Sequence, residues 1–91
     1  MADSAKALVL TIAIAGTPTQ VSSSLTSIGR VRVRNPYSNT GRVYVGGSDL
    51  DATHRFSLQV GEVLDIFNID LTGLYVTVEM NNETVELLWY I

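Results

Sequence analysis

The 91-residue sequence contains no cysteine and a single histidine, His54. Without cysteine the chain has neither disulfides nor a thiolate metal site, and His54 is its only side chain that serves as a base near neutral pH. The apolar run near the N-terminus is far too short to span a bilayer. A chain of this size without disulfides or a thiolate metal site depends on a well-packed core or on oligomerisation. A hydrophobic content of 46% suits either.

Charged residues are few and unevenly distributed. Residues 1–47 carry five basic residues and one acidic residue (+4), whereas residues 48–91 carry one basic and eight acidic residues (−7), which leaves −3 overall. Such a split favours complementary contacts, either within the fold or between neighbouring copies. The acidic total argues against nucleic acid as a partner.

The segment after Lys6 is apolar and resembles the centre of a secretory signal peptide. Asp3 lies where such a peptide is positively charged, so we expect no cleaved leader and no association with a membrane.

Alternation of apolar and polar residues dominates the chain, and no segment has convincing helical periodicity. Period-two patterns predict strands over residues 6–15, 28–35, 42–45, 63–67, 74–80 and 84–90, with a possible short strand near 54–58 and a loop or weak edge strand over 21–25. The sequence therefore predicts one all-β domain over residues 1–91. We expect a small β-sandwich or β-barrel of six to eight short antiparallel strands.

Turn residues suggest how neighbouring strands are joined. A loop rich in turn residues, 35–41, separates two predicted strands and indicates a hairpin between residues 28–35 and 42–45. Asn81-Asn82 indicates a second hairpin between residues 74–80 and 84–90, because asparagine tolerates left-handed backbone angles.

Three arginines alternate along one predicted strand. Arg30, Arg32 and Arg34 point to one side about 7 Å apart. The hairpin prediction places Arg42 on the facing strand and Tyr44 on the same side. One interpretation is a surface that binds an acidic partner, with phosphate as a weaker option. The other is a solvated face whose charges are balanced by the acidic half of the same chain.

Two further clusters suggest chemistry but have plainer explanations. A Ser-His-Asp triad would need His54, yet no nucleophile elbow is present, so we expect an ordinary loop or strand residue. Asp49 and Asp51 could contribute to a Ca²⁺ site with other carboxylates. The preferred interpretation is a turn capped by aspartate side chains, and we expect neither a metal nor another cofactor.

The aromatic residues could form a platform for a sugar. The candidates are Tyr37, Tyr44, Tyr75, Trp89 and Tyr90. Trp89 is in phase with Val85 and Leu87, so we expect it in the core. Tyr37 and Tyr44 are the better candidates, and core or rim packing is the alternative for all five.

Several short segments carry a resemblance to a known group of proteins. They are Val43–Asp49 (VYVGGSD), Leu58–Glu62 (LQVGE) and Leu74–Val76 (LYV), preceded by the strand Arg30–Asn35 (RVRVRN). Together they resemble small β proteins encoded among the structural genes of tailed bacteriophages, over a little more than half of the chain. None of these motifs is catalytic.

The resemblance implies a non-enzymatic structural component of the virion. Because the chain has no long repetitive shaft and no second domain, we expect a capsid decoration protein on the capsid surface. Such a protein binds the major capsid protein and stabilises the shell, commonly as a homo-oligomer, with a trimer favoured. The expected contact residues are Arg30, Arg32, Arg34, Arg42 and Tyr44.

Two other functions remain open at this point. A module of a phage tail tip or fibre that binds a host-surface glycan would use Tyr37 or Tyr44. An enzyme of cupin-like architecture is the third possibility, but metal-binding cupins typically need several histidines and this chain has one.

Overall fold

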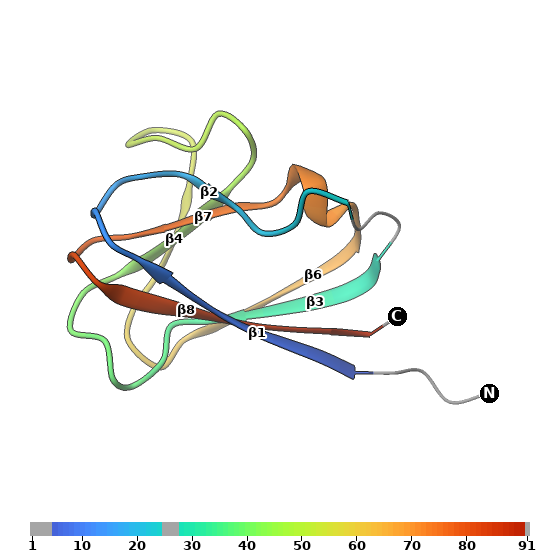
Figure 1. The fold of residues 1–91 in the computed structure, drawn as a ribbon, viewed down its shortest axis with the longest axis horizontal. Coiled ribbons are helices and arrows are strands. Elements are labelled where there is room, and N and C mark those ends of the chain that lie inside the picture. The colour runs from blue at the N-terminus through green and yellow to red at the C-terminus, as the bar shows by residue number, and fades with distance from the viewer. Residues whose placement is uncertain (1–4, 25–27, 91) are drawn as a thin grey trace.

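The structure, a computed structural model, describes residues 5–24 and 28–90. They form eight strands in two four-stranded antiparallel sheets that lie face to face (Figure 1). Sheet A has the order β1-β8-β3-β6, and sheet B has the order β2-β7-β4-β5. The elements are β1 (Ala5–Ile12), β2 (Thr19–Gln20), β3 (Ile28–Arg34), β4 (Val43–Gly46), β5 (Phe56–Leu58), β6 (Val63–Ile69), the short 3-10 helix η1 (Leu71–Gly73), β7 (Tyr75–Val78) and β8 (Glu83–Tyr90). The all-β prediction is confirmed, and two separate sheets make the fold a sandwich.

Most connections carry the chain from one sheet to the other. Within the described residues, β4 and β5 alone are both consecutive in sequence and paired. In Figure 1 the orange β7 runs through the upper layer, turns at the left, and continues as the dark red β8 in the lower layer. Eight antiparallel strands shared in this way between two sheets form a jelly roll.

Both predicted hairpins are wrong. Strand β3 pairs with β6 and β8, whereas β4 pairs with β5 and β7. Strands β7 and β8 are joined by a turn in which Asn82 has a φ of 64°, as asparagine permits, but they lie in opposite sheets. Alternation identifies the buried side of a strand and does not identify its neighbour. Each strand of these pairs buries apolar side chains, so the two cover one core from opposite sides.

Two strand ends differ from the prediction. Alternation places Ile14 on the inward side of the first strand, but Ile14 is 69% exposed. Strand β1 stops at Ile12 because the chain then turns towards sheet B through Gly16, whose φ is 83°. A weak edge strand is expected over residues 21–25, but the strand in this region, β2, is shorter and comes just before them. Residue 25 lies outside the described part of the chain.

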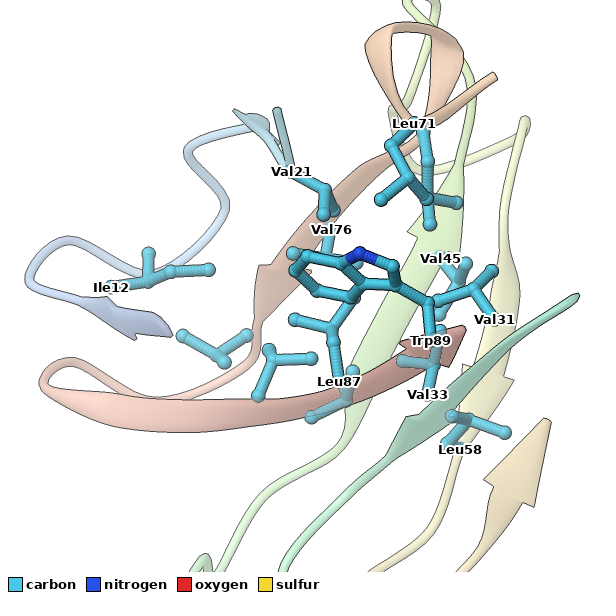
Figure 2. Packing of buried hydrophobic residues seen from close by; sticks show 14 residues of the cluster. Ile12, Val21, Val31, Val33, Val45, Leu58, Leu71, Val76, Leu87 and Trp89 are labelled. Carbon is cyan, nitrogen blue, oxygen red and sulfur yellow. The ribbon is translucent and has the colours of Figure 1, made fainter. Parts of the chain in front are cut away.

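The core lies between the two sheets and consists mainly of valine and leucine. Sheet A contributes Ile12, Val31, Val33, Val85, Leu87 and Trp89; sheet B and its flanking residues contribute Val21, Val43, Val45, Leu58, Leu71, Leu74, Val76 and Val78. Figure 2 shows the Trp89 ring in the middle of this cluster. Alternation predicts that Val31 and Val33 on β3, Val76 and Val78 on β7, and Val85, Leu87 and Trp89 on β8 point inward, and all of them are buried. Burial of these side chains is the main stabilising contribution to the fold.

Two buried asparagines hold the loop between β3 and β4. Asn35 Nδ2 donates hydrogen bonds to the carbonyl oxygens of Gly41 and Leu58, both at 3.0 Å. Asn39 Nδ2 donates to Asn35 Oδ1 at 2.8 Å and to the Thr84 carbonyl at 2.6 Å. Leu58 belongs to β5 and Thr84 to β8. The network therefore fastens one loop to a strand of each sheet.

We predict that Asn35→Ala lowers the free energy of unfolding by about 3 kcal/mol, because it leaves two buried carbonyl groups without a donor. Urea unfolding followed by circular dichroism measures this change. Ser38→Ala is the matched control, since Ser38 is exposed in the same loop, and it should change stability by less than about 0.5 kcal/mol. Similar losses in both variants would contradict the role given to Asn35.

Candidate functional site

The side of sheet A that points away from the core is here named the outer face. Its side chains alternate with the buried ones and come from all four strands. They are Ala7, Val9 and Thr11 from β1, Glu86 and Leu88 from β8, Arg30, Arg32 and Arg34 from β3, and Val63, Asp65 and Phe67 from β6. Val9, Val63 and Phe67 are 59%, 45% and 62% exposed. Exposed apolar side chains thus surround a row of charges.

The arginine row is paired with carboxylates on both neighbouring strands. Arg32 donates from Nε to Asp65 Oδ1 at 2.9 Å and from Nη2 to Oδ2 at 3.1 Å, a bidentate arrangement across β3 and β6. Arg34 is 2.6 Å from Glu86 Oε1 on β8. Arg30 is held more weakly, with its Nε 3.8 Å from Asp65 Oδ1 and its guanidinium 6.0 Å from the centre of the Phe67 ring.

These pairs show that two carboxylates of the acidic half, Asp65 and Glu86, face the arginine row. They leave the binding of a partner open as a prediction, because exposed ion pairs contribute little stability and exchange readily. The sequence indicated acidic counterparts through its charge split. It did not identify Asp65 or Glu86, because that choice depends on the pairing of β3 with β6 and β8.

The hydrogen bonds from Arg32 hold the pKa of Asp65 below its ordinary value of 3.8. Burial opposes this shift, and the charges of Arg32 and then Arg30 add to it. Asp65 therefore stabilises the fold above pH 3.8, and this contribution is lost as the pH falls through the lowered pKa.

We expect Arg32→Ser to raise the pKa of Asp65 towards 3.8, because the carboxylate loses its main hydrogen-bond donor. Carboxyl carbon chemical shifts measured by NMR over acidic pH report this pKa. Arg42→Ser is the control and should leave the Asp65 titration unchanged, since Arg42 bonds to Ser57 in the other sheet. An unchanged titration in Arg32→Ser would show that the bidentate pair does not persist in solution.

A shallow depression of about 340 Å³ lies on the outer face between β1, β8 and β3. It is lined by Ala7, Val9 and Leu88 on one side and by Arg32, Arg34 and Glu86 on the other. Ala7 contributes only a methyl group to this lining. The depression therefore offers apolar surface beside fixed charges of both signs.

The opposite side of the sandwich is covered by the chain itself. On sheet B, Leu50 and the backbone of His54 approach Gly46 so closely that a Cβ there would lie 2.9 Å from each. Tyr44 is only 7% exposed, and Leu50 and Thr77 are buried as well. The β4–β5 loop thus shields sheet B, whereas the outer face of sheet A keeps large apolar side chains in solvent.

Arg42 and Tyr44 do not join the arginine row, which corrects their expected placement. Arg42 precedes β4 in sheet B, and its Nη1 donates to Ser57 Oγ at 3.0 Å. The Tyr44 ring lies 3.7 Å beneath the guanidinium of Arg55, and its hydroxyl donates to Glu79 Oε2 at 3.2 Å. The expected placement depended on a hairpin between β3 and β4, but these two strands belong to different sheets.

The tyrosines favoured for a sugar platform have different environments. Tyr37 is 77% exposed in the β3–β4 loop, whereas Tyr44 is buried and one face of its ring is occupied by Arg55. Trp89 lies in the core, as predicted. An open stacking surface made by Tyr37 and Tyr44 together is therefore not present.

Asp51 caps a turn, as the preferred interpretation of Asp49 and Asp51 predicted. Its Oδ1 accepts hydrogen bonds from the backbone N–H groups of Thr53 and His54, at 2.8 and 2.9 Å, and from the Thr53 hydroxyl at 3.0 Å. These donors, with His54 Nδ1 at 2.9 Å, hold the pKa of Asp51 well below its ordinary value, the Thr53 N–H having the largest effect.

His54 is not arranged as the base of a triad. A triad places the acid and the nucleophile on opposite ring nitrogens. Here both Asp51 Oδ1 and Thr53 Oγ1 lie at Nδ1, at 2.9 and 3.0 Å. Over residues 5–24 and 28–90, no three His, Asp or Glu side chains gather in an arrangement that could hold a metal ion.

We predict a pKa of His54 above 6.5, because Asp51 accepts its hydrogen bond and the charges of Asp51 and, to a lesser extent, Asp49 favour the imidazolium. The associated stabilisation is complete below pH 6.5 and is lost as the pH rises through the raised pKa. NMR titration of the imidazole ring measures it. Asp51→Asn should return the pKa towards 6.5 and Asp49→Asn should have a smaller effect; the reverse order would contradict the Nδ1 geometry.

No protein-family model matches this chain, and no curated protein does. A solved structure described as a solution NMR structure of a de novo designed double-stranded β-helix is similar, with 15% identity over 96% of each chain and a TM-score of 0.47. The described part of the chain has no helix long and apolar enough to cross a membrane.

Proposed function

We propose that this protein is a non-enzymatic binding module that docks onto another protein through the outer face of sheet A. The observation that carries the proposal is the juxtaposition of Arg30, Arg32 and Arg34 with the exposed apolar side chains of Val9 and Phe67. Protein interfaces combine apolar surface with arginine in this way. The covering of sheet B by its own loop makes sheet A the better candidate.

The arginines suit a partner with an acidic surface. Arg30 has the weakest intramolecular pairing, at 3.8 Å from Asp65, and packs near Phe67. An incoming carboxylate of the partner accepts hydrogen bonds from Arg30, while the bidentate pair of Arg32 with Asp65 stays intact. Arg34 and Glu86 border the apolar depression. They therefore favour a partner that places complementary charges beside its apolar contact.

The resemblance of residues 39–90 to small bacteriophage β proteins leads to the more specific proposal. The protein is a capsid decoration protein that binds the major capsid protein on the surface of the virion and stabilises the shell. Many weakly bound copies on a lattice gain strength through multivalency, so a modest docking face is sufficient for this role. Quantitative mass spectrometry of purified particles should find it in a fixed ratio to the major capsid protein, and its absence from particles would refute the virion assignment.

We predict that the triple variant Arg30→Ser, Arg32→Ser, Arg34→Ser binds capsids that lack this protein about tenfold or more weakly, equivalent to about 1.4 kcal/mol per tenfold. Co-sedimentation with capsids measures the affinity. The fold should survive, because the lost ion pairs are exposed, and thermal unfolding checks this.

Arg42→Ser is the matched control for this experiment. It removes an arginine of sheet B, whose partner is Ser57, and should leave the affinity unchanged. If Arg42→Ser weakens binding as much as the triple variant, the docking face is misplaced. If neither variant weakens binding, the arginines take no part.

A further inference from the structure

Strand β1 is an edge strand that lacks the usual protection against pairing. The four edges of the two sheets are β1, β6, β2 and β5. Strands β2 and β5 have only two and three residues, and β6 carries Asp65 in its middle. Strand β1 has eight residues, AKALVLTI, with Lys6 as its one charge and no proline. Long apolar edges of this kind are open to pairing with another strand.

The hydrogen bonds of Thr84 identify which backbone groups of β1 point to the open edge. The N–H and the C=O of Thr84 both bond to the Asn39 side chain, away from β1. Because backbone direction alternates along a strand, Glu83, Val85 and Leu87 point their N–H and C=O groups to β1. Their register partners Ile12, Leu10 and Leu8 point back to β8. The groups of Ala7, Val9 and Thr11 therefore point outwards.

We propose that two copies of this chain form a dimer by antiparallel pairing of β1 with β1, about a two-fold axis at Val9. Val9 then pairs with Val9 of the second copy, and Ala7 pairs with Thr11. All three residues have outward N–H and C=O groups and side chains on the outer face, so hydrogen bonding and side-chain direction agree in this register. The two copies of sheet A become one continuous sheet.

Side chains favour a second copy over a foreign strand. Val9, which is 59% exposed, is covered by its own counterpart at the axis. The same register sets Lys6 opposite Ile12 of the second copy, which is itself paired with Glu83. Lys6 and Glu83 are then two strand spacings apart, about 10 Å between their Cα atoms, on the same side of the sheet. The Glu83 carboxylate accepts hydrogen bonds from the N–H groups of Thr40 and Gly41, so Lys6 approaches a fixed negative charge. The two-fold axis gives this approach of opposite charges twice.

The pairing closes on itself because each copy offers one β1 edge, so it gives a dimer and not a filament. The inference does not rest on capsid binding. A trimer, which the bacteriophage resemblance favours, would require a different contact.

Light scattering after size exclusion, over a range of micromolar concentrations, tests the dimer. The unaltered chain should have twice the monomer mass, and Val9→Lys should shift it to the monomer mass, because two lysines would meet at the axis. Val63→Lys is the matched control: it changes the same residue type on the same outer face at the opposite edge. It should leave the dimer intact.

Oxidation of Val9→Cys gives a second, independent readout. Cα atoms of a hydrogen-bonded antiparallel pair lie about 5.5 Å apart, which a disulfide spans, and the chain has no other cysteine. Val9→Cys should form a disulfide-linked dimer with unchanged circular dichroism. Val63→Cys should form no disulfide-linked dimer under non-reducing conditions at the same concentration, although its non-covalent dimer persists. Any of three results would overturn the proposal. The unaltered chain could be a monomer or a trimer, Val9→Lys could remain a dimer, or both cysteine variants could cross-link equally.

Discussion

The burial of one side of β3 in the core between the two sheets is the constraint on which the other features depend. Val31 and Val33 are fully buried in that core, while β8 and β6 pair with β3 on its two sides. Alternation then forces Arg30, Arg32 and Arg34 to the opposite side. A slip of one residue would bring guanidinium groups into the core, which is prohibitively costly. The same packing that stabilises the sandwich therefore produces the arginine row.

The asparagine network decides where the chain goes after β3. Asn35 and Asn39 satisfy backbone groups of β5, of β8 and of the β3–β4 loop itself, so the chain leaves sheet A and enters sheet B at this corner. Arg42 and Tyr44 follow the corner and are carried to the far side of the sandwich. Hydrogen-bonded asparagines thus separate residues that lie close together in the sequence and limit the candidate docking face to β3 and its neighbours.

Two carboxylates orient the arginines of the outer face without neutralising all three positive charges. Asp65 and Glu86 orient Arg32 and Arg34 through short hydrogen bonds, and Arg30 retains only a longer contact. Oriented arginines lose less conformational freedom on binding than mobile ones. Beside them, β1 exposes both apolar side chains and outward backbone groups, so protein docking and self-association would use adjoining parts of one sheet.

The sequence by itself determined the all-β class, the approximate strands and the buried side of most of them, because these follow from period-two alternation and turn residues. It also determined the Asp51 turn and the place of Trp89 in the core, because those depend on local bonding and phase. Only the tertiary structure decided which strands are neighbours, and hence that Asp65 and Glu86 meet the arginines while Tyr44 lies under Arg55. The physical reason is that strand order depends on how distant segments share one core, and alternation is the same whether the next strand lies beside its predecessor or across from it.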